Sequence, residues 1–577
     1  MDAQRMTIPK SHCLKELGGQ VQRCIDVDGR AFHYRTMGQG PAVVILHDSP
    51  RSSRLHLETM RGLSDLYTVY AFDTPGYGNS APLEKPEPAI ADFAAALSAA
   101  IETLGLRGVP LYATHTSAKI ALEYAARFAE PARLILDGLS TPQSAPDLAF
   151  IERYMRPMRL DDDGGYLAVE WTRMRDMVRW FPWFLREPDK RMPIDAPTDE
   201  WLSDYAIDFL SAGPHYSSAY AAAMRYDPMA ALRDVACPTL IAARSDDVLY
   251  PHLDFVPVEE NPALTVERLP ADRSAWLHWL KQSLRVENDA SVSRSGRVPL
   301  PARTACFVDL PHGQMLVHRR GEGTDTPLLI LDAPTTLQAR RWQELFSERP
   351  TLVPELPGFG ESSPLPSPSL KAAVDALALM LDGLAIESVD LLASGFATPL
   401  AATLAHHHPD RVRSVTLDGC FQLGDSAAGE FAERLCPQFP FDGLAGAHLH
   451  RYWHMLRDMS ANWPWHSGDA DTRRRDEPIL SAPELHQALL GILKQPARYG
   501  DIARAGCLVR TAERYPAFPQ PALLFHRAGD PAHAGAPALQ AGLPNAEIRE
   551  RPARWDDAAR LVRELLDGHA AAQENAQ

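Results

Sequence analysis

The residue that most clearly could do chemistry is His115, at the tip of a tight turn of small residues. The residues before it, L-Y-A at 111–113, are apolar and predict a buried strand, and I-A-L-E-Y-A-A-R-F at 120–128 predicts a helix. A sharp connection of this kind presents the side chain at its tip to a pocket. An imidazole in that place could act as a general base or as a nucleophile.

The elements around this turn alternate between strands and helices. Buried strands are predicted in A-V-V-I-L-H-D-S-P at 42–50, Y-T-V-Y-A-F-D-T-P-G-Y-G-N-S at 67–80, R-L-I-L-D-G at 133–138 and P-T-L-I-A-A-R-S-D-D at 238–247. This alternation favours a doubly wound, mostly parallel α/β domain. Residues 140–234 interrupt it with a segment rich in Trp, Met, Tyr and Arg at helical spacing, which predicts a helical cap insertion.

The same series recurs in the second half of the chain. P-L-L-I-L-D-A-P at 327–334, E-L-P-G-F-G-E-S-S-P at 355–364 and L-L-A-S-G-F-A-T-P-L-A at 391–401 match the first-half motifs in order. Asp73 and Glu355 are 282 positions apart, as are Trp171 and Trp453, and Gly395 takes the place of His115. We therefore predict a duplicated domain, with the following parts: an N-terminal extension at 1–20, domain 1 at 21–286, a linker at 287–303, domain 2 at 304–568 with a cap at about 420–516, and a tail at 569–577.

These motifs, in this order, resemble the α/β-hydrolase fold superfamily over nearly all of the chain. The turn at His115 corresponds to the family's nucleophile elbow, which normally reads G-x-S-x-G. The first half more narrowly resembles bacterial α/β-hydrolase-like proteins with H-x-S-P and G-x-H-T-G motifs. The resemblance implies two tandem α/β-hydrolase domains, each with a helical cap.

The resemblance also implies site residues. It places the acid at Asp247 in domain 1 and at Asp530 in a degenerate second site, and an oxyanion hole at the backbone N–H groups of Asp48, Ser49 and Thr116. The nucleophile is replaced by His115 and Gly395, and Ser117 and Ser394 stand beside the two tips but out of register. The usual histidine base is missing from both halves, which leaves His278 as a weak substitute and excludes a serine triad. The catalytic candidates are therefore His115, Asp247 and His47.

Other residues have a functional and a structural interpretation. Trp171, Met177, Trp180 and Trp183 are expected to line the substrate pocket from the cap, or else only to pack the cap helices. His47 in H-D-S-P could act at the site or bond within its own loop. Arg175–Asp176 recurs as Arg457–Asp458 and indicates a structural ion pair. The run at 406–408 (H-H-H) fits a helix C-terminus better than a metal site, because consecutive helical residues face different directions.

Composition limits the class of protein. The 577 residues carry a net charge of −16, which argues against nucleic acid and anionic membranes as partners. The N-terminus lacks a signal-peptide core, and no apolar run approaches the ~18 residues of a membrane helix. Seven scattered cysteines without a C-x-x-C motif fit a reducing cytoplasm. We expect a cytoplasmic protein without a cofactor, whose two halves pack on each other.

The leading functional hypothesis is an enzyme that works from domain 1. It is a hydrolase or lyase for a small, carbonyl-bearing, partly apolar substrate, with His115 in place of the serine. The alternative is an inactive pseudo-hydrolase that binds a small molecule or serves as a scaffold. A weaker third possibility is a metal site formed by His47, Asp48, His115 and Asp247.

Overall fold

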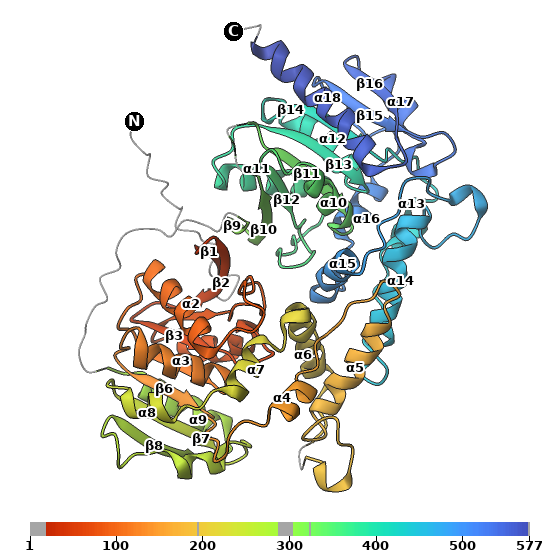
Figure 1. Ribbon diagram of the computed structural model, residues 1–577. Helices are drawn as coiled ribbons and strands as arrows, with labels where there is room; N and C mark the ends of the chain where they lie inside the picture. The colour runs from red at the N-terminus through yellow and green to blue at the C-terminus, as the bar shows by residue number, and fades with distance from the viewer. Residues whose placement is uncertain (1–18, 193–194, 287–303, 322, 324, 575–577) are drawn as a thin grey trace. The chain divides into compact units, whose positions relative to one another are not determined.

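The computed structural model describes residues 19–192, 195–286, 304–321, 323 and 325–574 (Figure 1). The predicted linker at 287–303 and most of the predicted N-terminal extension, with Cys13, lie outside these residues. The chain divides into two compact units. The first unit consists of the described residues within Gly18–Leu160 and Ala168–Arg303. The second unit consists of those within Asp161–Leu167 and Thr304–Gln577.

The first unit is built on an eight-stranded sheet in the order β1-β2-β4-β3-β5-β6-β7-β8. The β1–β2 and β2–β4 pairs are antiparallel, and all other neighbours are parallel. The strands are β1 (Val21–Val27), β2 (Arg30–Met37), β3 (Ala42–Leu46), β4 (Thr68–Phe72), β5 (Leu111–Thr114), β6 (Leu134–Asp137), β7 (Thr239–Arg244) and β8 (Leu264–Leu269).

Helices connect these strands. They are α1 (Leu57–Leu63), α2 (Ile90–Thr103), α3 (Thr116–Arg127), α4 (Leu148–Tyr154), α5 (Gly165–Met177), α6 (Asp199–Ala212), α7 (Ser218–Arg225), α8 (Met229–Asp234) and α9 (Arg273–Ser283). The helices α4 to α8 stand between β6 and β7, where the sequence predicts the cap. Short 3₁₀ turns follow β3 (Ser53–His56) and β7 (Tyr250–Phe255).

The second unit repeats the same topology, with its sheet in the order β9-β10-β12-β11-β13-β14-β15-β16. Here β9–β10 and β10–β12 are the antiparallel pairs. The strands are β9 (Ala305–Leu310), β10 (Gly313–Arg320), β11 (Leu328–Ala333), β12 (Thr351–Pro354), β13 (Val389–Gly395), β14 (Val412–Asp418), β15 (Ala522–His526) and β16 (Ala546–Glu550). Two sheets of identical order confirm the predicted tandem α/β fold.

The helices of the second unit also follow the first-unit order. They are α10 (Leu337–Leu345), α11 (Leu370–Gly383), α12 (Thr398–His407), α13 (Ala428–Leu435), α14 (Ala447–Ala461), α15 (Ala482–Lys494), α16 (Asp501–Leu508), α17 (Ala536–Gln540) and α18 (Trp555–Glu574). The prediction of a tail from residue 569 was wrong in part, because α18 continues to Glu574.

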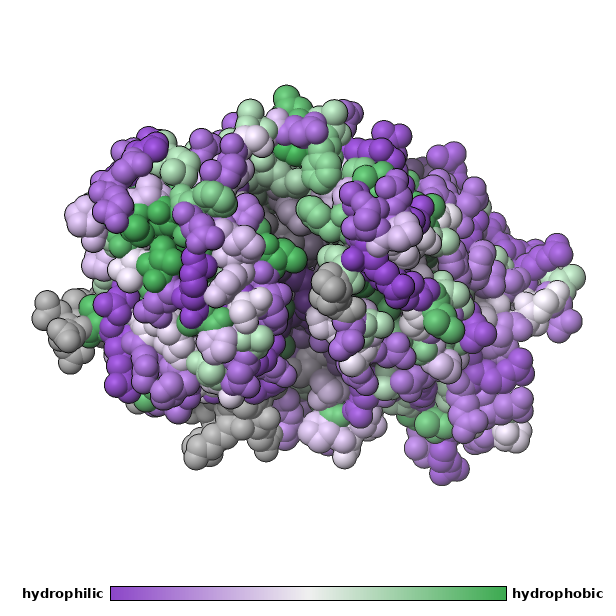
Figure 2. Space-filling view, turned by 90° about the horizontal axis from the view of Figure 1, so that it is seen from below, coloured by the Kyte–Doolittle hydropathy of each residue, from purple (hydrophilic) through white to green (hydrophobic). Residues whose placement is uncertain are grey.

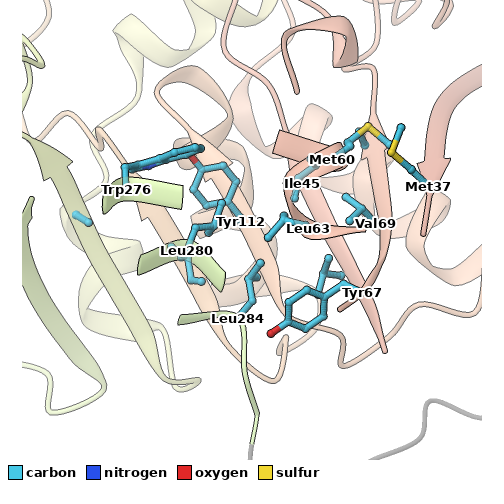
Figure 3. Close-up of a cluster of buried hydrophobic side chains, with 14 of the residues drawn as sticks. Met37, Ile45, Met60, Leu63, Tyr67, Val69, Tyr112, Trp276, Leu280 and Leu284 are labelled. Atoms are coloured by element: carbon cyan, nitrogen blue, oxygen red, sulfur yellow. The ribbon is translucent and has the colours of Figure 1, made fainter. Parts of the chain in front are cut away.

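One hydrophobic core of the first unit lies between its sheet and two helices. In Figure 3 the side chains of Met60 and Leu63 from α1 and of Trp276 and Leu280 from α9 point toward those of the strands. These side chains are at most 8 % exposed. The strand A-V-V-I-L at 42–46 is buried at four of its five residues, as expected for a parallel strand covered on both faces.

The surface is mainly polar. Figure 2 shows hydrophilic residues over most of the visible face, with apolar residues in small groups. No helix in the described part of the chain is long and apolar enough to cross a bilayer. The six described cysteines are all buried free thiols, in keeping with the scattered positions that argue against disulfides.

Candidate active site

The turn at His115 connects β5 directly to α3. The backbone of His115 adopts φ 46° and ψ −110°, so its side chain projects from a sharp bend between the strand and the helix. The His115 N–H donates to the carbonyl of Asp137 at 3.0 Å, and the N–H of Ala118 donates to the carbonyl of His115 at 3.0 Å. The small residues around the turn let strand and helix approach closely at this bend.

Asp247 reaches this turn from the loop after β7. Its Oδ1 accepts the backbone N–H of Leu249 at 2.8 Å, which fixes the carboxylate. Its Oδ2 lies 2.8 Å from Nε2 of His115. The two residues singled out in the sequence are therefore in direct contact, and the imidazole bonds to the acid without an intervening base.

The charges of this pair support each other. Burial by itself lowers the pKa of His115, but the hydrogen bond and charge of Asp247 outweigh it. Two further carboxylates, Asp48 and Asp137, add to the effect, so the pKa of His115 rises to about 9. Burial raises the pKa of Asp247, yet the bond to His115 holds it below its ordinary value. At neutral pH the pair is an imidazolium beside a carboxylate. The His115 side chain is 38 % exposed, so solvent or a ligand can reach it.

Asp137, at the end of β6, is a neighbour that sequence reasoning missed. Its Oδ2 accepts the hydroxyl of Tyr112 at 2.9 Å and the indole N–H of Trp276 at 2.8 Å. Burial raises its pKa above the ordinary value. The signal was present, because L-D-G follows a buried strand in both halves, at 136–138 and 417–419.

His47 and Asp48, in the loop after β3, differ in their hydrogen bonds. The Nδ1 of His47 lies 2.8 Å from the carbonyl of Asp48, and its Nε2 accepts the N–H of Thr74 at 2.9 Å. Both ring nitrogens thus bond to backbone groups, as in the structural interpretation of His47. By contrast, Oδ1 of Asp48 is buried and has no hydrogen-bond partner among the described residues.

The predicted oxyanion donors are backbone groups near the tip. Thr116 is the first residue of α3, and its N–H has no intrahelical partner, as in the first turn of any helix. Asp48 and Ser49 lie in the loop after β3, whose carbonyl at His47 accepts the hydroxyl of Ser117. Ser117 is thereby committed to the loop and does not serve as a nucleophile.

The corresponding turn in the second unit has Gly395 at its tip, with φ 54°. It lines a pocket together with residues of β11, α10, the cap and the start of α18: Asp332, Gln338, Trp463, Arg474 and Trp555. Ser394 faces away from this pocket, is fully buried and accepts the indole N–H of Trp342 at 3.0 Å. The second unit therefore keeps the shape of the turn without a nucleophile at its tip.

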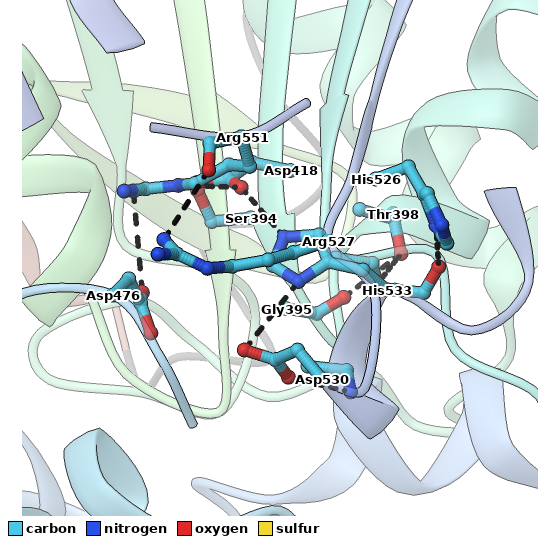
Figure 4. Close-up of polar contacts among 12 residues, drawn as sticks. Ser394, Gly395, Thr398, Asp418, Asp476, His526, Arg527, Asp530, His533 and Arg551 are labelled. Atoms are coloured by element: carbon cyan, nitrogen blue, oxygen red, sulfur yellow. Dashed lines mark hydrogen bonds and ion pairs between the residues drawn. The ribbon is translucent and has the colours of Figure 1, made fainter. Parts of the chain in front are cut away.

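A buried charge network lies beside Gly395 (Figure 4). His533 lies 3.1 Å from Asp418 and 3.7 Å from Asp530, and its side chain is 0 % exposed. Arg551, also 0 % exposed, contacts both oxygens of Asp418 at 3.2 Å. His533 lies three residues after Asp530, so it is a different residue from the histidine base that would follow the last strand.

Family models match a region in each half of the chain. A model of the alpha/beta hydrolase family matches residues 43–290, and a model of the alpha/beta hydrolase fold matches residues 337–442. Each half is therefore similar to the α/β-hydrolase family.

Each of three similar solved structures covers a little under half of this chain. An epoxide hydrolase from Vigna radiata is 18 % identical over 46 % of this chain and 96 % of its own, with a TM-score of 0.37. An enol-lactonase from Burkholderia xenovorans is 16 % identical over 45 % of this chain and 99 % of its own, with a TM-score of 0.35. An E-2-(acetamidomethylene)succinate hydrolase is 19 % identical over 46 % and 99 %, with a TM-score of 0.33. No curated protein sequence matches the chain.

The four cap residues make contacts within the cap. Trp171 and Trp183 are buried, and the Trp183 indole donates to the carbonyl of Tyr154 at 3.0 Å. Met177 accepts the hydroxyl of Tyr205 at 3.8 Å, and Trp180 pairs with Arg191 in an isolated β-bridge. Trp183 also lines a pocket of the cap together with Arg156 and Arg173.

Other sequence-level candidates are also placed. Asp176 pairs with Arg186 at 2.6 Å. His278 is exposed on α9, 2.9 Å from Gln282, and contacts neither His115 nor Asp247. His406 and His407 end α12 on the surface. Within the described ranges no group of three or more His, Cys, Asp or Glu side chains could hold a metal ion.

Gly138 has no side chain, and the His115–Asp247 pair occupies the space where a β-carbon would lie. A β-carbon there would lie 2.6 Å from Cδ2 and 2.7 Å from Nε2 of His115, and 3.1 Å from Oδ2 of Asp247, at φ +70°. We expect Gly138→Ala to displace the imidazole and to destabilise the chain by about 1–3 kcal/mol in urea unfolding. Gly108→Ala is the control, because φ is +75° there and nothing lies within 4 Å. Equal loss of stability in the two variants would contradict the predicted clash.

Proposed function

We propose that the first unit is a hydrolase or lyase that acts on a small, partly apolar substrate with a carbonyl group. The observation that carries the proposal is the His115–Asp247 contact of 2.8 Å at the tip of the nucleophile elbow. In a conventional member the acid orients a histidine that activates a serine. Here the imidazole stands in the place of the serine and bonds directly to the acid, so one step of that relay is absent.

The protonation state of His115 determines its role. A residue with a pKa of about 9 is mostly imidazolium at neutral pH and has no free lone pair. It is therefore a poor nucleophile or base and a good proton donor. We infer that His115 donates to the carbonyl oxygen of the substrate, which withdraws electrons from the carbonyl carbon. The N–H of Thr116 supports the same oxygen.

The Asp48 carboxylate completes this scheme as the proton acceptor. Its buried Oδ1 lacks a hydrogen-bond partner in the described structure, and its charge contributes to the raised pKa of His115. For hydrolysis, water attacks the carbonyl carbon, its proton passes to Asp48, and the developing oxyanion is stabilised by the protonated His115. As the carbonyl re-forms, the bond to the leaving group breaks, and that group takes the proton from Asp48. For a lyase, Asp48 takes a proton from the carbon beside the carbonyl and His115 stabilises the enolate. As the carbonyl re-forms, the bond to a leaving group on the next carbon breaks, and that group takes the proton from Asp48.

The surroundings of Asp48 fit a partly apolar substrate. Burial raises the pKa values of Tyr205 and Tyr220, and the charge of Asp48 adds to both effects, so the two phenols lie within its field. Tyr154 packs against Tyr220 with ring centroids 6.0 Å apart. These aromatic side chains offer apolar contact area beside the acidic group.

The experiment that tests the proposal is a turnover screen of the purified chain against esters, lactones and β-diketones. Product formation that follows saturation kinetics is the expected result, and Asp48→Asn should lower kcat by about 100-fold or more as for a lost general base. Saturable binding of these compounds without any product would favour the alternative, a pseudo-hydrolase that only binds its ligand.

The pH dependence follows from the same pair. Because His115 acts as an acid, activity requires its protonated form, which is present below pH 9 and lost as the pH rises through about 9. We expect kcat/KM to fall along a single limb near pH 9. Asp247→Asn removes the carboxylate that raises the pKa of His115 most, while burial still lowers that pKa. The fall in kcat/KM should therefore move to lower pH. A limb that stays near pH 9 in that variant would contradict the assignment.

A further inference from the structure

The pocket at Gly395 is open at the place where the nucleophile of a conventional elbow would stand. A methyl group added at Gly395 would lie 3.4 Å from Nε2 of Gln338, 3.7 Å from the carbonyl oxygen of Ala333 and 3.9 Å from Oδ1 of Asp332. All three are ordinary contact distances. The floor of the pocket therefore has room for a small ligand group, surrounded by polar atoms.

These polar atoms are mainly hydrogen-bond acceptors. Asp332 is buried, and its Oδ2 accepts the N–H of Gln338 at 2.7 Å and that of Ala339 at 3.4 Å, at the start of α10. Its Oδ1 is the oxygen that approaches Gly395. The amide oxygen of Gln338 is buried and has no hydrogen-bond partner in the described part of the chain. An unsatisfied buried acceptor costs free energy, which a ligand with N–H donors would recover.

The charges around the floor favour a cation. Arg474, the one basic residue that lines the pocket, is already paired with both oxygens of Asp476, at 2.8 and 3.2 Å. Glu477 also lines the pocket and forms no ion pair among the described residues. Burial raises the pKa of Asp332 to about 7, so a cation bound beside it would favour the ionised carboxylate.

The walls of the pocket are aromatic. The ring of Trp463 lies parallel to that of Phe396, with centroids 6.0 Å apart and an angle of 14°. Trp465 and Trp555 also line the pocket. Indole faces attract cations and offer flat apolar surface to a ring or short chain.

We propose that the second unit binds a small amine, with its ammonium group on the floor between Asp332 and Gln338 and its apolar part against Trp463. Of the three atoms nearest to the tip of the turn, the carbonyl oxygen of Ala333 and Oδ1 of Asp332 are acceptors, and Nε2 of Gln338 is a donor. This site is separate from the one proposed for His115, and it carries out no bond-breaking step. The pocket thus acts as a ligand site in a unit whose nucleophile is absent.

Isothermal calorimetry on the full chain tests this proposal with three probes of one shape: benzylamine, benzyl alcohol and benzoate. We expect benzylamine to bind one site with a Kd on the order of 1 mM, as its size allows. Benzyl alcohol and benzoate should bind at least ~10-fold more weakly. Asp332→Asn should weaken benzylamine by about 10- to 100-fold, since a charge-assisted hydrogen bond is lost.

Matched variants locate the binding. Asp375→Asn removes an exposed carboxylate on α11 that pairs with Lys371 and should leave the affinity unchanged. His115→Ala should also leave it unchanged, which separates this result from the proposed function. Gln338→Leu gives a second reading if Asp332→Asn does not fold. Absence of benzylamine binding, equal binding of benzoate, full affinity in Gln338→Leu and Asp332→Asn, or loss of binding in His115→Ala would each overturn the proposal.

Discussion

His115→Ala is expected to lower kcat/KM by about 10²–10⁴-fold on any substrate that the screen identifies, which is the usual contribution of a general acid. The reason is local: the imidazole stands at the elbow tip, bonds to Asp247 and is 38 % exposed. Alanine keeps the backbone turn and removes the proton donor. The measurement is steady-state kinetics on the full chain, with thermal melts to show that the variant folds.

His278→Ala is the control for this result. His278 is an exposed imidazole of the same unit, on α9, and it contacts only Gln282 among the described residues. Its removal should leave kcat/KM within a factor of about 2, as for most surface substitutions. If His115→Ala keeps full turnover while folded, the proposed chemistry at the elbow is wrong.

Arg551→Met is expected to destabilise the second unit by about 3–5 kcal/mol, because it leaves a buried carboxylate without its main partner. Burial alone would raise the pKa of Asp418, but Arg551 and His533 outweigh it and hold the pKa well below its usual range. The Arg551 guanidinium also lies 4.5 Å from the centroid of the Trp555 ring and donates to the carbonyl of Pro552 at 2.8 Å. Methionine fills part of the volume and supplies none of these bonds. Urea unfolding followed by circular dichroism measures the loss.

Arg560→Met provides the comparison on α18. Arg560 is exposed and pairs with Asp557 at 3.3 Å, so its loss should change the free energy of unfolding by at most ~0.5 kcal/mol. The double variant Asp418→Asn, Arg551→Met should recover part of the stability, because the buried charge is gone. A cost below ~1 kcal/mol for Arg551→Met alone would show that the network does not stabilise the unit.

The tandem fold could be predicted from the sequence because its signals are local and repeated. Apolar strands and the elbow motif recur about 280 positions apart, and each copy supports the other. The meeting of His115 and Asp247 followed from the same logic, since loops at the carboxyl ends of parallel strands share one edge of the sheet.

The rest depended on long-range contacts that no local pattern encodes. His533 faces Asp418, 115 positions away, and Arg551 faces it from 133 positions away. The pairing of Asp176 with Arg186, ten positions away, depends on how the cap folds back. The sequence also does not show that Oδ1 of Asp48 lacks a hydrogen-bond partner in the described structure while the neighbouring His47 ring bonds to backbone, because this depends on which groups lie next to each side chain. The sequence pattern predicted that these residues lie near the site, but it did not predict which residues they contact.

The backbone angles at the two elbow tips have a further consequence for how the two copies can change over time. A side chain with a β-carbon at φ 46° carries a steric strain of about 1–2 kcal/mol, which glycine at φ 54° in the other copy avoids. Glycine, which stands at the corresponding position of the second unit, carries no such strain. A histidine retained under that strain marks the first elbow as a place where folding stability is traded for the imidazole itself.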